Sequence, residues 1–226
     1  KKTNSFSYRV IVTTTNHWSD NAQRSIKNQT IPVTLIGLKD FDESPIEWSS
    51  FDLDKPDDIV LNEAIRNGAV AFAQIPRTQA GSMIGLAGGG LGFSGGMALG
   101  LKLAQPARTV VQVVGDGSFY FCNPAAVYAV ASQYRLPIFT VVLDNGVLAA
   151  VKEATLLMHP DGEAKRQGAF VSQLAQGMAF AKIAEAAGGY GETLTEPSET
   201  AAAIRRCLEQ VRGGRCAVLH AHIVPH

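Results

Sequence analysis

The feature that most constrains the fold is a valine-rich run at residues 110–114 that ends abruptly in Gly115-Asp116-Gly117. A continuous β-branched run of this kind is typical of a parallel strand that is buried on both faces. The turn that follows delivers the Asp116 carboxylate to the carboxyl edge of the sheet, where open α/β sheets bind their ligands. We therefore expect an α/β fold with Asp116 in the ligand site.

Strand-like and helix-like segments alternate from residue 58 to the end of the chain. Strands are expected at residues 59–62, 110–114, 137–143 and 216–223, and helices at 93–103, 124–134, 179–187 and 198–212. This alternation predicts a doubly wound parallel sheet with helices on both faces. Residues 155–178 show no clear period and exceed an ordinary connection in length, so we expect a lid or binding loop there.

A small β-α-β segment precedes this domain. Residues 8–14 and 31–36 have the β-branched content of strands, and residues 19–27 fit a short amphipathic helix. Residues 51–58 have the most linker-like composition in the chain. We therefore divide the chain into a small α/β segment at 1–57 and a main domain at 58–226.

Charge and composition argue against several kinds of partner. Twenty basic and twenty acidic residues cancel, which gives no electrostatic footprint for nucleic acid or for an anionic membrane. No apolar run reaches the roughly 18 residues that a membrane-spanning helix needs. The three cysteines lack disulfide or metal spacing and suit a reducing compartment. We expect a cytoplasmic protein that binds neither nucleic acid nor membranes.

A second polar pair, Asp144-Asn145, follows the next expected strand. Two adjacent strand ends would thus bring the Asp116 carboxylate and the Asn145 amide oxygen to one cation, and a backbone carbonyl just after Asn145 would complete the protein ligands. Mg²⁺ prefers such oxygen ligands together with phosphate and water. The helix that starts after Asp116 can also face a phosphate with its free N–H groups. The sequence therefore predicts a Mg²⁺ ion that holds a diphosphate.

The run from Gly115 to Ser118, followed at this spacing by Asn145, resembles the thiamine-diphosphate motif of the acetolactate synthase and benzoylformate decarboxylase superfamily. Gly81-Ser82, the glycine-rich stretch 88–93 and residues 133–137 match the same family in the same order. The resemblance covers residues 58–223, which correspond to the family's C-terminal, diphosphate-binding domain. It implies thiamine diphosphate and Mg²⁺ as cofactors.

The resemblance also implies roles for particular residues. The side chains of Asp116 and Asn145 and the backbone oxygen of Val147 would bind Mg²⁺, while Gly117 and Ser118 would approach the diphosphate.

Leu91 resembles the bulky residue that holds the cofactor in its bent form, and the carbonyl of Gly89 would accept the cofactor's 4′-amino group. Asn62 and Glu63 stand where the family contacts the diphosphate from a neighbouring strand. Asp144 departs from the family, because it replaces an asparagine that is common there and adds negative charge near the metal.

The family reaction decarboxylates a 2-oxo acid and then protonates the product or joins it to a second carbonyl compound. The glutamate that activates the cofactor belongs, in this family, to a pyrimidine-binding domain that usually comes from another subunit. Nothing in residues 1–57 resembles that domain. We therefore expect a homo-oligomer in which this chain carries part of the active site, has no catalytic residue of its own and is inactive alone.

The first part of the chain resembles something else. His17-Trp18-Ser19, residues 28–33 and residues 44–48 are similar to the end of an Mrr-type restriction-endonuclease-like module. That family's metal-binding nuclease residues have no counterpart in this stretch, so the resemblance implies no nuclease activity here. A natural fusion of the two modules is one explanation, and an ordinary α/β lead-in segment is the other.

Two further functions compete with thiamine diphosphate binding. Gly90, Gly92 and Gly95 satisfy the G-x-G-x-x-G pattern of an NAD-binding Rossmann oxidoreductase, with Asp116 at the distance of a ribose-binding acid. Against it, residues 85–88 make a poor strand, whereas that fingerprint needs a strong one. A non-catalytic fragment that keeps the fold is the third possibility. His220 and His222 have the spacing of metal ligands on a strand, but we expect them at the surface.

Overall fold

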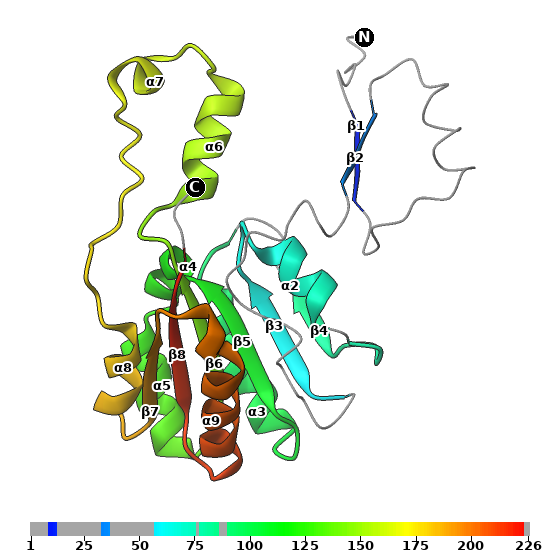
Figure 1. Cartoon of the computed structure of the whole chain (residues 1–226). Coiled ribbons are helices and arrows are strands. Elements are labelled where there is room, and N and C mark those ends of the chain that lie inside the picture. Colours follow the sequence, from blue (N-terminus) through cyan, green and yellow to red (C-terminus); the bar gives the residue numbers. More distant parts are fainter. Residues whose placement is uncertain (1–8, 13–32, 37–56, 76, 86–89, 224–226) are drawn as a thin grey trace. The chain divides into compact units, whose positions relative to one another are not determined.

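The computed structural model describes residues 9–12, 33–36, 57–75, 77–85 and 90–223 (Figure 1). The chain divides into two compact units, Lys1–Ser44 and Pro45–His226, and each is considered by itself. The domain boundary near residue 57 stays a prediction.

The first unit contains a two-stranded parallel sheet. Strand β1 (Arg9–Val12) pairs with strand β2 (Val33–Ile36), with Arg9 opposite Val33 and Val12 opposite Ile36. Both strands fall within the segments expected to be strands. The helix expected at residues 19–27 lies outside the described residues. A parallel pair needs a crossover between its strands, so the pairing agrees with a β-α-β segment.

The second unit is built on a six-stranded sheet, and the predicted parallel α/β architecture is confirmed. The strands are β3 (Ile59–Glu63), β4 (Met83–Gly85), β5 (Val110–Gly115), β6 (Phe139–Asp144), β7 (Tyr190–Leu194) and β8 (Ala217–His222). They pair in the order β4-β3-β5-β6-β8-β7, and every pairing is parallel. Strand β5, the valine-rich run, therefore lies inside the sheet.

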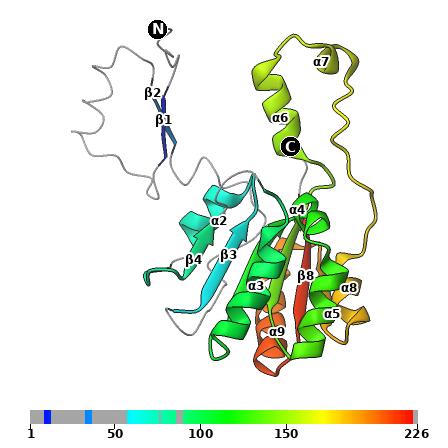
Figure 2. The same cartoon turned by 180° about the vertical axis from the view of Figure 1, so that it is seen from behind.

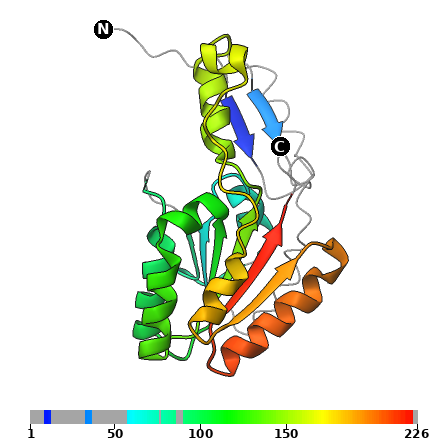
Figure 3. The same cartoon turned by 90° about the vertical axis from the view of Figure 1, so that its left-hand side faces the viewer.

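Helices connect the strands of this unit, and some of them cover the two faces of the sheet. They are α2 (Gly68–Gln74), α3 (Phe93–Ala104), α4 (Asp116–Phe121), α5 (Pro124–Tyr134), α6 (Ala149–Met158), α7 (Glu163–Gln167), α8 (Phe180–Ala186) and α9 (Thr200–Arg212), with a short 3₁₀ turn η3 at Pro197–Glu199. Helices α3, α5 and α8 pack on one face, and α9 packs on the other (Figures 2 and 3). None of the helices in the described part of the chain is long and apolar enough to cross a membrane.

A chain of hydrogen bonds crosses the buried sheet. The Tyr128 hydroxyl donates to Thr140 Oγ1 at 2.7 Å, and the Thr140 hydroxyl donates to Gln112 Oε1 at 2.9 Å. Gln112 Nε2 then donates to Ser94 Oγ at 2.7 Å. All four side chains are buried, and buried polar groups must find such partners. The bonds tie strands β5 and β6 to the helices α3 and α5 that pack on them.

Three elements differ from expectation. Strand β4 has only three residues and α2 only seven, and segments this short give no periodic signal, so neither was predicted. Gly85, which was expected to make a poor strand, lies in strand β4. The expected loop at 155–178 is partly wrong, because α6 extends to Met158 and α7 follows at Glu163. Residues 149–158 are mostly strong helix formers, which favours this helix.

The cysteines provide a test of the packing. Burial raises the pKa of the thiols of Cys122, Cys207 and Cys216. For Cys122, where the Glu63 carboxylate contributes as well, the pKa rises to about 12. Because only the thiolate is the nucleophile, the reactive fraction of Cys122 at pH 8 falls by a factor on the order of 10³ relative to an ordinary thiol. We expect Ellman's reagent to label the native chain slowly at pH 8 and three thiols quickly in guanidinium. Rapid labelling of three thiols in the native chain would contradict this packing.

Candidate cofactor site at the carboxyl edge of the sheet

A cleft opens at the carboxyl edge of the sheet, where the connections of two neighbouring strands diverge. From β3 the chain runs outward to β4, and through α3 it returns to β5 on the other side of β3. Such a divergence is where open α/β sheets bind ligands. The cleft is lined by residues that follow β3 (residues 64–67), by the end of β5 and the start of α4 (residues 115–118), and by residues that follow β6, Asn145 and Val147 among them. Helices α6 and α7 extend beyond this edge (Figure 1).

Most of the predicted site residues border this cleft. Those that line it are Leu91, Asp116, Gly117, Ser118, Asn145 and Val147. Asn62 and Glu63 are not among its lining residues, and Gly89 lies outside the described residues.

Asp116 joins the ends of two strands. It is 5% exposed and begins helix α4 directly after β5. Its Oδ1 accepts the N–H of Gly117 at 2.8 Å, and its Oδ2 accepts the N–H of Gly146, beyond the end of β6, also at 2.8 Å. Gly146 N–H is shared with Asp144 Oδ1 at 2.9 Å. The carboxylates that follow β5 and end β6 therefore lie together.

The charge of Asp116 is poorly compensated. Burial, and next the neighbouring Asp144 side chain, raise the pKa of Asp116 to about 6, although the two backbone N–H groups oppose this rise. Arg66 is the single basic residue among the described residues that line the cleft, and it is paired with Glu153. A buried carboxylate without a cationic side chain beside it is a favourable ligand for a bound cation.

The loop after β6 is held in a fixed shape. Asn145 Oδ1 accepts the N–H of Val147 at 3.1 Å, and Gly146 adopts a left-handed conformation with φ of +68°. The carbonyl of Gly146 accepts the N–H of Leu174 and the side-chain amide of Gln176, both at 3.0 Å. The donor set near Asp116 thus consists of carboxylate, amide and carbonyl oxygens, which are the ligands that Mg²⁺ prefers.

Gly117 leaves room beside this donor set. A Cβ atom at this position would collide with the Leu148 side chain, which also lines the cleft. The backbone of α4 therefore borders the cleft without a side chain in the way, as a close approach to a ligand requires.

Glu63 and Asn62 hold the surroundings of the cleft. The fully buried Glu63 carboxylate accepts the N–H groups of Gly92 and Ser94 and the Ser94 hydroxyl, so it caps helix α3. Asn62 Oδ1 accepts the N–H of Ala64 at 3.2 Å, and its amide donates to the carbonyl of Gly68 at 2.7 Å. Both side chains are bonded to the segments that border the cleft. The sequence identified these two residues as site candidates, but it did not predict that they hold the segments around the cleft in place.

Replacing Glu63 with glutamine tests whether the Glu63 carboxylate caps helix α3. The amide would present a donor to groups that are themselves donors, which leaves a buried N–H without an acceptor. We expect a loss of about 1–3 kcal/mol in the free energy of unfolding, measured by urea denaturation. Glu185→Gln is the matched control, because Glu185 is exposed and pairs with Lys182 on the same helix, a contact worth about 0.5 kcal/mol or less. Equal stability of the two variants would refute the capping role.

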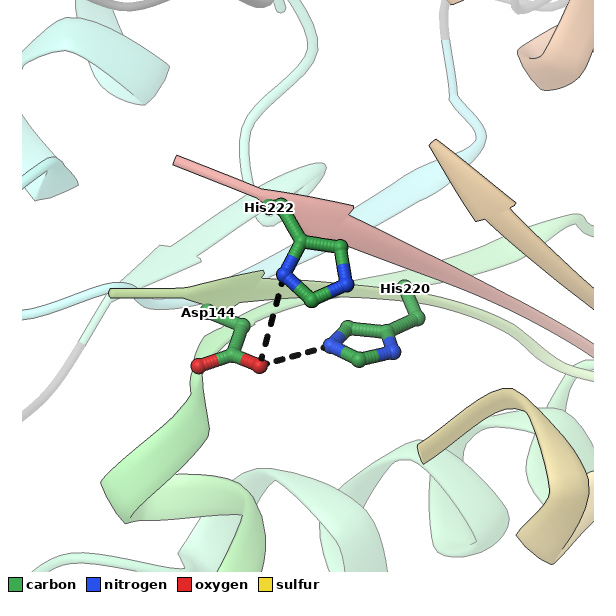
Figure 4. Close-up of side chains that lie close together, drawn as sticks. All are labelled: Asp144, His220 and His222. Atoms are coloured by element: carbon green, nitrogen blue, oxygen red, sulfur yellow. Dashed lines mark hydrogen bonds and ion pairs between the residues drawn. The ribbon is translucent and has the colours of Figure 1, made fainter. Parts of the chain in front are cut away.

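His220 corrects a prediction. It was expected at the surface, but it is 1% exposed, and its Nε2 lies 2.7 Å from Asp144 Oδ2 (Figure 4). The expectation rested on the alternation of His220 and His222 along the closing strand, but that strand, β8, lies between β6 and β7 inside the sheet. The hydrogen bond from His220, then those from Asp116 and Gly146, lower the pKa of Asp144 against the opposing effect of burial. The extra negative charge at Asp144 therefore has a partner.

Two family models match different parts of the chain. The model described as "Thiamine pyrophosphate enzyme, C-terminal TPP binding domain" matches residues 67–221. A model described as "Restriction endonuclease" matches residues 1–58, in agreement with the resemblance of that segment.

Curated relatives support the first of these matches. The chain is 34% identical to the acetolactate synthase isozyme 3 large subunit of Escherichia coli over 127 residues, which cover 56% of this chain and 21% of the relative. It is 34% identical to benzoylformate decarboxylase of Pseudomonas aeruginosa over 96 residues, which cover 42% of this chain and 18% of the relative. The chain thus spans about a fifth of the length of these relatives.

Solved structures agree on the fold. A thiamine diphosphate-dependent 4-hydroxybenzoylformate decarboxylase from Rhodococcus jostii superposes with a TM-score of 0.63 at 23% identity, over 79% of this chain and 32% of that one. A benzoylformate decarboxylase from Polynucleobacter necessarius gives the same TM-score at 20% identity, over 80% of this chain and 32% of that one.

Proposed function

Because this chain belongs to the thiamine pyrophosphate enzymes and contains their C-terminal TPP-binding domain, we propose that it binds thiamine diphosphate through Mg²⁺ in the cleft at the carboxyl edge of the sheet. The observation that carries the proposal is the buried Asp116 carboxylate, which lies beside Asp144 in a cleft where Arg66, the basic residue among the described lining residues, is already paired with Glu153.

The residues of the cleft fit this cofactor. Asp116, the Asn145 side chain and the backbone oxygen of Val147 hold the metal ion. Gly117 and Ser118 approach the diphosphate at the start of helix α4, and Gly117 does so without a side chain. Leu91 is 37% exposed and lines the cleft, where its side chain supports the bent form of the cofactor.

The chemistry comes from the cofactor, which when bound supplies an electron sink for a 2-oxo acid substrate. The chain's own residues bind and orient the diphosphate end, and none of those in the cleft is assigned a proton transfer. The activating glutamate comes from a pyrimidine-binding domain, on another chain or another segment, in a homo-oligomer. The chain by itself therefore binds the cofactor but does not turn over a substrate. The names of the relatives, an acetolactate synthase and a benzoylformate decarboxylase, support decarboxylation or carboligation as the reaction.

Calorimetric titration of the full chain tests the proposal. We expect thiamine diphosphate to bind when Mg²⁺ is present and to bind far more weakly when EDTA is added, while thiamine without its diphosphate does not bind measurably. Binding that ignores the metal would contradict the site. Binding of NAD without a response to thiamine diphosphate would favour the Rossmann interpretation instead.

A further inference from the structure

Three potential metal ligands converge beside the cleft, on two neighbouring strands. Asp144 ends β6, and His220 and His222 lie on β8, with Asp144 directly opposite His222 in the parallel register. Side chains two residues apart on a strand point to the same face of the sheet. The register and this period together place the carboxylate and both imidazoles on one face (Figure 4).

The three ligand atoms are close enough to share one ion. His220 Nε2 lies 2.7 Å from Asp144 Oδ2, His222 Nδ1 lies 3.9 Å from the same oxygen, and all three atoms lie within 4.8 Å of one another. Metal–ligand lengths of about 2.0–2.2 Å separate the ligand atoms of one tetrahedral ion by roughly 3–3.5 Å. The observed distances bracket that spacing, and a rotation of the half-exposed His222 ring brings the third atom into it.

The surroundings resemble those of a built site that opens to solvent on one side. The His220 side chain is 2% exposed and that of Asp144 is 16% exposed, whereas that of His222 is 48% exposed. The His220 ring is fixed by an edge contact with Phe180 at 5.0 Å between ring centres. Two of the three ligands are therefore held in place before any ion arrives, and the third faces the side from which an ion can enter.

The ligand types indicate which ions fit. Two imidazoles and one carboxylate suit borderline ions such as Zn²⁺, Co²⁺ and Ni²⁺, whereas Mg²⁺ prefers oxygen ligands alone. We propose that Asp144, His220 and His222 form a second metal site, separate from the Asp116 and Asn145 ligand set, which binds one divalent transition-metal ion. Three protein ligands leave at least one coordination position open. A bound ion would also fasten the end of β8 to the end of β6.

Equilibrium dialysis and visible absorption with Co²⁺ test this site on the full chain. We expect one high-affinity ion per chain for Zn²⁺, and with Co²⁺ the intense visible bands of a low-symmetry site with nitrogen ligands. Excess Mg²⁺ does not displace the ion. His222→Ala weakens Zn²⁺ affinity by about 100-fold or more, because it removes one of three protein ligands. The matched control is His159→Ala, which removes an exposed histidine on the connection between α6 and α7 and leaves the affinity unchanged.

Several outcomes would overturn the proposal. These are the absence of Zn²⁺ binding, Zn²⁺ binding that His222→Ala and Asp144→Asn both leave intact, and a Co²⁺ spectrum like that of the free aqueous ion. In those cases His220 serves only as the hydrogen-bond partner of Asp144. The result is separable from the proposed cofactor function, because His222→Ala is expected to bind thiamine diphosphate with Mg²⁺ as the unmodified chain does.

Discussion

Replacing Asp116 with alanine is expected to weaken Mg²⁺-dependent binding of thiamine diphosphate by more than about 100-fold. The substitution removes a buried carboxylate that accepts N–H groups both at the start of α4, after β5, and in the loop after β6. On the proposed function, the metal would then keep only neutral oxygen ligands from the protein and would hold the diphosphate less tightly. Titration calorimetry at a fixed Mg²⁺ concentration measures the dissociation constant of thiamine diphosphate for Asp116→Ala and for the unmodified chain.

The fold is expected to survive this substitution. The Gly146 N–H, which loses Asp116 as an acceptor, keeps Asp144 Oδ1 at 2.9 Å. Burial and the neighbouring Asp144 raise the pKa of Asp116, so the folded state disfavours its charge, and we expect its removal to cost the cofactor-free chain little stability. Asp161→Ala is the matched control, since the side chain of Asp161 is 94% exposed. A dissociation constant within about threefold of the control's would contradict the role of Asp116.

The largest expected effect on stability is that of Gly92→Ala. Gly92 has a φ of +89°, which costs a residue with a side chain roughly 1–2 kcal/mol. Its Cβ atom would lie 2.5 Å from the carbonyl carbon of Phe121 and 2.7 Å from the nitrogen of Cys122. These are backbone atoms and cannot rotate away, so overpacking adds roughly 1–3 kcal/mol. We expect the free energy of unfolding to fall by about 3 kcal/mol in urea denaturation.

Gly100→Ala provides the comparison for this variant. Gly100 lies in the same helix region, on the exposed side of α3, and a Cβ atom there meets nothing within 4 Å. Alanine in a helix is favoured over glycine by roughly 0.5–1 kcal/mol, so this variant is expected to gain stability. If Gly92→Ala unfolded at the same urea concentration as the unmodified chain, the contact between α3 and the end of α4 would be wrong.

This packing also explains the G-x-G-x-x-G pattern. Gly92 packs directly against the backbone at the end of α4. A Cβ atom at Gly95 would lie 3.0 Å from Val127 and 3.1 Å from Cys122. Two of the three glycines are thus required by contacts of the α3 region with α4 and α5. The strand before the pattern, β4, is an edge strand of three residues. Because packing accounts for these glycines, they give no support to the dinucleotide-binding interpretation.

The parts of the site that follow from local sequence could be predicted. The valine-rich run and its Gly-Asp-Gly ending define a buried strand and its terminal carboxylate, and Asn145 lies one strand later. The structure brings Asp116 and the loop around Asn145 together as expected. The roles of Glu63 and His220 could not be predicted in this way. Glu63 reaches residues 29 and 31 positions away, and His220 is buried because β7 is the outer strand and β8 is not.

The most direct test is a crystal structure of the full chain with thiamine diphosphate and Mn²⁺ in place of Mg²⁺. The anomalous signal of Mn²⁺ locates the metal independently of the cofactor. We predict a strong peak between Asp116, the Asn145 side chain and the Val147 carbonyl, with the diphosphate bound to the same ion. A peak confined to Asp144, His220 and His222, or a diphosphate away from the carboxyl edge of β5, would contradict it.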